Sequence, residues 1–209
     1  MKQFSRFIST IFMPLFMPTY NVALLFVYTY FNYVYVGHFY ALIVPTILFT
    51  FLLPGILIFV MHQIGIISDL ALPFRRDRFM PYAVTVISFS FLIFYFYRLG
   101  MPTWFLTMIG SSIVVMLLAT IITLWWKISA HMFGVSGLLG GVMAVSYFVE
   151  KSNPTSLFMI LFVITGMVGT SRIILKRHTP AQVYAGFFLG FIVSFIGVWV
   201  GSSMPSTTP

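Results

Sequence analysis

The sequence predicts an all-α protein, a polytopic transmembrane helical bundle with six to seven membrane spans in a single domain. Of the 209 residues, 60% are hydrophobic and only 7% are charged, which is more apolar surface than a soluble core of this size can hide. Apolar stretches of about 17 to 25 residues, long enough for a helix to cross the hydrocarbon layer, recur along the chain. They lack the alternation of barrel strands, and helices satisfy their own backbone in lipid.

Seven apolar segments with brief connectors account for the predicted helices, and the connectors leave no room for a second domain. The first and third segments are short and rich in aromatic residues, so their ends are the least defined. In chain order, the predicted spans cover residues 20–36, 41–62, 82–98, 103–126, 131–149, 155–173 and 181–200.

The two ends of the chain are expected to lie outside these spans. Residues 1–19 place two basic residues ahead of an apolar stretch, which superficially suggests a signal peptide. Pro14 and Pro18 interrupt the stretch and no A-x-A cleavage site follows, so we expect an interfacial N-terminal stub that leads into the first span. Residues 202–209 form a polar, uncharged tail that we expect to be disordered.

The formal charge of +8 is distributed unevenly between the two sides of the predicted bundle. Arg98 and Lys151 fall on one side, and the other nine basic residues fall on the side where the chain begins. The nine are Lys2, Arg6, Arg75, Arg76, Arg78, Lys127, Arg172, Lys176 and Arg177. The positive-inside rule would put this face in the cytoplasm, and an anion site for phosphate headgroups would gather the same residues. The two explanations are compatible.

Three polar clusters are predicted to meet at this basic face. They are RRDRFMPY at 75–82, KISAH at 127–131 and SRIILKRHTPAQ at 171–182. Two predicted spans separate the first cluster from the second, and two more separate the second from the third. Because an even number of crossings returns the chain to the side that it left, the sequence predicts one composite polar site.

Helix starts in the second and third clusters favour anion binding. Ser129 suits the N-cap of the fifth span, so the N–H groups of the next residues would point into the aqueous pocket. Lys127 and this helix start would cradle an anion, with His131 facing it. His178 lies at the junction before the seventh span, because Pro180 suits the first turn of a helix.

These residues resemble the motifs of the type-2 phosphatidic acid phosphatase superfamily, whose membrane members are lipid phosphatases. The motifs are K-x6-R-P, P-S-G-H and S-R-x5-H-x3-D. Ser171-Arg172, five residues and then His178 match the first part of the third motif. The sequence Ser129-Ala130-His131 resembles S-G-H.

The first motif is a looser match. Arg78 precedes Pro81 by three residues and the lysine of the motif is absent, although Arg75 or Arg76 could stand in for it. The resemblance covers about half the chain, from residue 75 onward.

The resemblance implies a metal-independent lipid phosphatase that works through a phosphohistidine. His178 would be the nucleophile, His131 would protonate the leaving group, and Arg172 would hold the phosphoryl oxygens. The residues that it implies for phosphate binding are Arg78, Arg75, Lys127, Ser129 and Ser171. The chemistry is consistent with the residues themselves, because a neutral imidazole is nucleophilic near physiological pH and arginines stabilise the charge that develops in phosphoryl transfer.

Gln182 stands where the family usually has an aspartate that orients the nucleophilic histidine. A glutamine carbonyl can accept an N–H bond from imidazole, but it supplies no negative charge to stabilise an imidazolium. Gln182 also fits a capping box with Thr179, and the two roles are compatible. Asp77 could approach the site or pair with a neighbouring arginine, and the sequence leaves both open.

No cofactor and no metal are expected, because Asp69, Asp77 and Glu150 are the only acidic residues and there is no cysteine. The expected partners are membrane lipids and a phosphorylated lipid substrate, and no nucleic acid. The substrate could be a phosphatidate, a phosphatidylglycerophosphate, an isoprenyl diphosphate or a glycolipid phosphate. The sequence leaves the oligomeric state open.

Two other functions stay open. One is a non-enzymatic membrane protein that binds or moves anionic lipids, and the other is a lipid phosphotransferase. The expected location is a bacterial inner membrane. The charge distribution favours a site on the cytoplasmic side, whereas bacterial proteins of the resembled kind commonly act on the outer face.

Glycines spaced four residues apart predict where helices approach closely. They are Gly137 and Gly141 in the fifth span and Gly186 and Gly190 in the seventh. Close packing of these two spans would hold the two histidines at a fixed separation.

Overall fold

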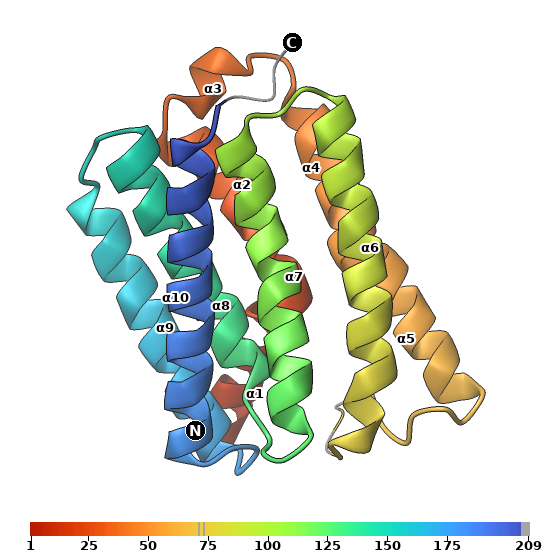
Figure 1. The fold of residues 1–209 in the computed structure, drawn as a ribbon. Helices are drawn as coiled ribbons and strands as arrows, with labels where there is room; N and C mark the ends of the chain where they lie inside the picture. The colour runs from red at the N-terminus through yellow and green to blue at the C-terminus, as the bar shows by residue number, and fades with distance from the viewer. Residues whose placement is uncertain (71, 73, 206–209) are drawn as a thin grey trace.

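The computed structural model in Figure 1 is a bundle of long helices that run roughly side by side. It describes residues 1–70, 72 and 74–205, and within these ranges it contains helices and no strand. Seven helical segments of this described part are long and apolar enough to cross a membrane. They are Lys2–Tyr28, Phe39–Gln63, Arg76–Arg98, Thr103–Thr123, Ala130–Val149, Thr155–Ile174 and Pro180–Ser203. The protein is therefore a multi-pass membrane protein, and the predicted fold class is confirmed.

The first two spans are interrupted. The first consists of α1 (Lys2–Ile11), a short turn at Pro14–Phe16 and α2 (Met17–Tyr28). The second consists of α4 (Phe39–Ile47) and α5 (Leu53–Gln63), joined by a π-helical turn at Leu48–Leu52. Pro45 and Pro54 lie on either side of that turn, where the missing N–H groups of proline interrupt regular hydrogen bonding. The short helix α3 (Phe31–Val34) connects the two spans.

The other five spans are nearly continuous helices. They are α6 (Phe79–Arg98), α7 (Thr103–Thr123), α8 (Ala130–Ala144), α9 (Thr155–Ile174) and α10 (Pro180–Ser203). A 3-10 turn at Arg76–Arg78 precedes α6, and a π-helical turn at Val145–Val149 follows α8. When the π-helical turn after α8 is counted, the bounds of these helices lie within a few residues of the predicted spans.

The first span differs from the prediction of residues 20–36. Pro14 begins the short turn and Pro18 lies in the first turn of α2, so both prolines initiate helical structure rather than exclude it. The helix then ends at Tyr28, where the Thr29 hydroxyl donates to the Leu25 carbonyl and accepts from the Phe31 N–H. Residues 1–19, expected to be an interfacial stub, thus include α1 and the beginning of α2.

The helix α8 lies at the centre of the bundle and packs most extensively against α10, with further contacts to α7, α2 and α9. A Cβ atom at Gly190 would collide with the Phe133 carbonyl, and one at Gly186 would lie 2.9 Å from the Ser129 carbonyl. The predicted close approach of the fifth and seventh spans is therefore confirmed. On α8, however, Gly137 and Gly140 face α10, whereas Gly141 faces Asn21 of α2.

The two ends of the described chain lie at opposite ends of the bundle, with the N-terminus beside the start of α10 and the C-terminus beside its end (Figure 1). Residues 202 and 203 of the expected tail belong to the last turn of α10. The carbonyl of Pro205 accepts a hydrogen bond from the Thr103 hydroxyl at 3.0 Å. Residues 206–209 lie outside the described part of the chain.

Candidate active site

The three polar clusters lie at the same end of the bundle, as predicted from the even number of crossings between them. The turn before α6, the connector from α7 to α8 and the connector from α9 to α10 all lie at the lower end in Figure 1. We call this the basic end. A direct contact joins the first cluster to the second there, because Arg78 donates to the carbonyl of Ile128 at 2.9 Å.

Arg78 is the buried arginine of the first cluster, with 6% of its surface exposed. Its Nη1 donates to Ile128 and its Nε donates to the Leu72 carbonyl at 3.2 Å. Both acceptors are uncharged, so these bonds fix the guanidinium without neutralising it. A buried, unneutralised cation is costly unless an anion binds beside it.

Arg75, three residues earlier, is exposed and points elsewhere. Its Nη1 donates to the carbonyls of Trp125 at 2.7 Å and Leu124 at 3.3 Å, just after the end of α7. A cation suits the carbonyl end of a helix, and Arg75 thereby fastens the first cluster to the second. Of the two arginines proposed for phosphate, only Arg78 is built into the buried cluster.

His178 is 9% exposed and is held by Gln182, one turn into α10. Its Nδ1 lies 3.1 Å from Gln182 Oε1, and the same oxygen accepts from the Thr179 N–H at 3.2 Å. The Thr179 hydroxyl accepts from the Gln182 N–H, which completes the capping box. Both roles considered for Gln182 are thus present in one geometry.

This geometry determines which nitrogen of His178 carries the proton. The Thr179 N–H can only donate, so the Gln182 atom that it meets must be the amide oxygen. An oxygen that accepts from Thr179 also accepts from His178, so Nδ1 bears the hydrogen. In the neutral ring, Nε2 therefore has a free lone pair.

The surroundings of His178 favour its neutral form. Burial lowers the pKa of His178 well below its usual value of 6.5, the hydrogen bond to Gln182 opposes this, and the charges of Arg172 and Arg78 lower the pKa further. The pKa of Lys127 is also lowered, first by burial and then by the charge of Arg78. Each of these groups senses the charge of Arg78, which places them in one electrostatic environment.

His131 and Arg172 meet at a residue that sequence reasoning missed. His131 Nε2 lies 3.1 Å from the carbonyl oxygen of Ser9, and Arg172 Nη1 donates to the Ser9 hydroxyl at 3.2 Å. Ser9 belongs to α1, which packs along α9. A carbonyl only accepts, so His131 carries its proton on Nε2. No local pattern in residues 1–19 signalled this contact, because it depends on how α1 packs.

Two buried polar atoms in the second and third clusters have no hydrogen-bond partner within the described residues. They are the hydroxyl of Ser129 and Nε of Arg172. Ser129 is completely buried at the N-cap of α8, and its side chain makes no capping bond. Ser171 is also buried, at 3% exposure beside Arg172. Unpaired buried donors are costly, and a bound ligand with acceptor oxygens would satisfy them.

An open pocket leads from His178 to the surface of the basic end. Its lining includes Lys127, Lys176 and Arg177, together with Thr179 and Gln182. Counting its wide opening, the pocket contains about 700 Å³ of unfilled space. Arg78, Arg172 and His131 do not line it.

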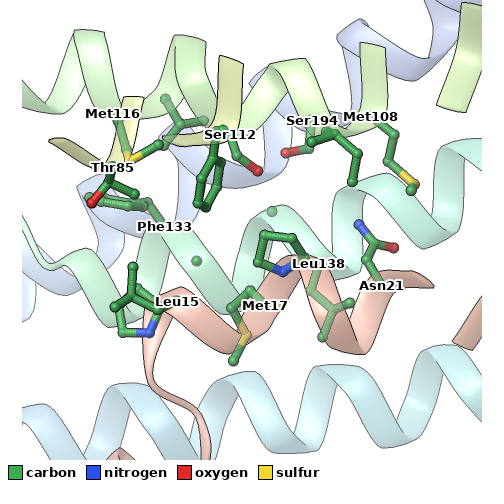
Figure 2. Close-up of a pocket in the computed structure, with 17 residues that line it drawn as sticks. Leu15, Met17, Asn21, Thr85, Met108, Ser112, Met116, Phe133, Leu138 and Ser194 are labelled. Atoms are coloured by element: carbon green, nitrogen blue, oxygen red, sulfur yellow. The ribbon is translucent and has the colours of Figure 1, made fainter. Parts of the chain in front are cut away.

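A second cavity lies inside the bundle between α2, α6, α7, α8 and α10. In Figure 2, Thr85, Met116 and Phe133 lie near one end and Asn21 and Met108 near the other. Phe133 and Gly134 follow His131 by two and three residues, so the cavity starts within about one helical turn of this histidine. The lining is mostly apolar, with a few hydroxyl groups and the amide of Asn21.

The acidic side chains are engaged by other groups. Asp77 accepts from the N–H of Ser68 at 3.1 Å and from the Ser68 hydroxyl, and Glu150 accepts from the Tyr30 N–H at the opposite end of the bundle. Within the described residues, no group of three or more His, Asp or Glu side chains is arranged to hold a metal ion.

The chain matches no protein-family model, no curated protein and no solved structure. The similarity to type-2 phosphatidic acid phosphatases therefore depends on the motif residues alone, and the function has to be argued from the site.

Proposed function

We propose that this protein is a membrane lipid phosphatase that hydrolyses a phosphomonoester or diphosphate of a lipid through a phosphohistidine. The observation that carries the proposal is the state of His178. Its Nδ1–H is donated to Gln182, which leaves the Nε2 lone pair without a hydrogen, and the charges of Arg78 and Arg172 act on it. A neutral imidazole close to two arginines suits nucleophilic attack on phosphorus.

In the proposed first step, the Nε2 lone pair of His178 attacks the phosphorus atom. The bond from phosphorus to the leaving oxygen breaks, and the imidazolium form of His131 donates its Nε2 proton to that oxygen. In the second step, a water molecule attacks the phosphohistidine and gives a proton to the now neutral His131, the P–N bond breaks, and inorganic phosphate leaves. Arg78, Arg172 and the Ser129 hydroxyl would stabilise the phosphoryl oxygens as negative charge spreads over them.

Two features support a lipid as the substrate. The open pocket beside His178 is lined by Lys127, Lys176 and Arg177, which suits a phosphorylated headgroup at the membrane surface. The cavity inside the bundle has the largely apolar lining that is common in ligand sites.

We place the protein in a bacterial inner membrane, with the basic end toward the cytoplasm. The distribution of lysine and arginine supports this orientation, since nine of eleven basic residues belong to segments at that end.

The test is phosphate release by the purified protein in detergent from phosphatidate, phosphatidylglycerophosphate, an isoprenyl diphosphate and a glycolipid phosphate. We expect release from at least one substrate, its loss in His178→Ala by at least ~10³-fold, and its retention in His38→Ala. His38 is a suitable control because it is exposed at the opposite end, where it contacts the Val36 carbonyl and the ring of Tyr35.

Two results would replace the proposal with an alternative. If the protein binds these lipids without releasing phosphate, it is a binding or transfer protein. If phosphate leaves lipid only when an acceptor alcohol is supplied, the protein is a phosphotransferase.

A further inference from the structure

Ser9 of α1 receives hydrogen bonds from both His131 and Arg172. The backbone carbonyl accepts from His131 Nε2 at 3.1 Å, and the hydroxyl accepts from Arg172 Nη1 at 3.2 Å. These two donors come from α8 and α9, and they are the groups assigned above to the leaving oxygen and the phosphoryl oxygens. A single residue of the N-terminal helix thus supplies oxygens where the proposed chemistry needs oxygens of the substrate.

These contacts and the proposed reaction compete for the same proton. An imidazole Nε2–H has one hydrogen, which is directed at Ser9 in this structure. His131 cannot donate that hydrogen to a leaving oxygen while Ser9 holds it. The substrate therefore has to displace Ser9, or Ser9 has to withdraw first.

The break in the chain after α1 would allow this helix to move away from the site. The helix ends at Ile11, and the backbone changes direction at Phe12 and Met13 before Pro14 begins the next turn. The Tyr20 hydroxyl donates to the Ile11 carbonyl at 3.0 Å and anchors this junction to α2. The joint lies outside the helices, so α1 can pivot without unwinding α2.

The surface of α1 is two-sided. Ser5, Ile8 and Ser9 are buried against the bundle, whereas Phe4 and Phe7 are 57% and 60% exposed. Lys2 and Arg6 are exposed as well. A short helix with aromatic and basic residues on its outer side can rest at the membrane interface when it leaves the bundle.

We propose that α1 is a cover for the active site, in which Ser9 occupies the place of substrate oxygens at rest and is displaced when a phosphorylated lipid binds. This inference rests on the proposed function, because it assigns the donors of His131 and Arg172 to the substrate.

The first test measures whether Ser9 is released. The chain has no cysteine, so Ser9→Cys introduces a unique thiol at a position that is 8% exposed. We expect slow labelling by a water-soluble maleimide at rest, and labelling at least ~5-fold faster with orthovanadate, which mimics a phosphoryl group at the site. The control is Thr10→Cys, one residue along on the exposed side, which we expect to label at the same rate in both conditions.

The outcomes of this test distinguish a failure of the cover proposal from a failure of the proposed function. If vanadate inhibits phosphate release but leaves Ser9→Cys protected, α1 is not a cover and the phosphatase proposal stands. If the protein releases no phosphate from any lipid, the proposed function fails and the cover fails with it.

The second test adds a negative charge at residue 9, which should hold α1 more tightly over the site. Ser9→Asp places a carboxylate beside Arg172, and we expect it to raise KM by about 10- to 100-fold, the range for a hydrogen bond between charged groups. Thr10→Asp adds the same charge on the exposed side and should leave KM within about twofold, since exposed charges interact weakly. If Ser9 instead positions His131 during the reaction, Ser9→Asp will lower kcat without changing KM, and the cover proposal is wrong.

Discussion

The two ends of the bundle are both polar, but they use their polar groups differently. At the end opposite the basic end, the Tyr30 N–H donates to Glu150 at 3.0 Å, His38 pairs with the Val36 carbonyl, and the Thr29 hydroxyl caps the end of α2. At the basic end, Ser129 and Arg172 retain buried polar atoms without partners in the described chain. The polar groups just named at the opposite end have hydrogen-bond partners, whereas these two buried groups at the basic end have none within the described residues.

The difference separates membrane anchoring from a site for chemistry. Any multi-pass protein needs polar and aromatic residues at both interfaces, and the exposed Tyr33 of α3 and Tyr30 just before it are typical of such a belt. Anchoring does not require a buried arginine or a histidine held in one tautomer. The unpaired buried groups at the basic end carry a cost in stability, and a ligand there would offset it.

The largest expected effect on activity comes from replacing an arginine at the basic end, compared with an arginine at the opposite end. Arg172→Ala should reduce kcat/KM for lipid phosphate hydrolysis by about 10²- to 10³-fold, because it removes a donor to the phosphoryl oxygens. Arg98→Ala, an exposed arginine at the other end, should leave kcat/KM unchanged. Equal losses in both variants would show that the arginines act only through membrane insertion.

The next comparison concerns glycines along α10. A Cβ at Gly190 would collide with the carbonyl of Phe133 on α8, and one at Gly201 would collide with the Thr107 side chain on α7. Both Gly190→Ala and Gly201→Ala should lower the free energy of unfolding by about 1–3 kcal/mol, measured by thermal unfolding in detergent.

Only Gly190→Ala should also lower the activity of the folded fraction, because it separates the helices that carry the two histidines. Gly166→Ala is the control for both variants, since a Cβ there meets nothing within 4 Å. Activity that falls equally in Gly190→Ala and Gly201→Ala would contradict this assignment.

A third comparison concerns the pH dependence of activity. Because burial holds the pKa of His178 below 6.5, we expect the nucleophile to stay neutral, and the acid limb of kcat/KM to lie below pH 6.5. Gln182→Glu keeps the capping box and places a carboxylate beside Nδ1, which raises the pKa and should move the acid limb upward by about one pH unit or more. Gln63→Glu, on an exposed residue, should leave the profile unchanged, and an unmoved limb in Gln182→Glu would argue against His178 as the titrating group.

The smallest expected effect concerns lysines. Lys127 is half-buried beside the open pocket, and Lys127→Ala should raise KM by about threefold at low salt and by less at high salt, as for a screened headgroup contact. Lys151→Ala at the other end should have no effect at either salt concentration. A KM change in Lys127→Ala that does not depend on salt would indicate a structural role.

Hydropathy predicted most of the helical spans. The even number of spans between the three polar clusters predicted that these clusters lie at the same end of the bundle. Both depend on long segments, where one residue matters little. The detailed contacts depend on helix rotation, which the sequence leaves open. Gly141 was expected beside α10, but a rotation of α8 turns it to α2 and brings Gly140 to α10 instead.

In the candidate site, too, the sequence did not predict the direction of every side chain. Arg75 and Arg78 differ by three positions in one basic run, yet one caps α7 and the other is buried, because a 3-10 turn aims them in different directions. His178 and Gln182 could be paired from sequence because they are four residues apart across a helix start. Ser9 could not be paired with Arg172, since the two residues are far apart in sequence and meet only through the packing of α1 on α9.

The odd number of crossings has a practical consequence for working with this protein. An affinity tag or fluorescent reporter fused beyond Pro205 resides in the compartment across the bilayer from His178, so it can be used for capture or imaging without crowding the substrate. The same tag placed ahead of Met1 would sit on the helix that carries Ser9. Fusion proteins that differ only in where the tag is attached should therefore differ in turnover, although their folded cores are identical.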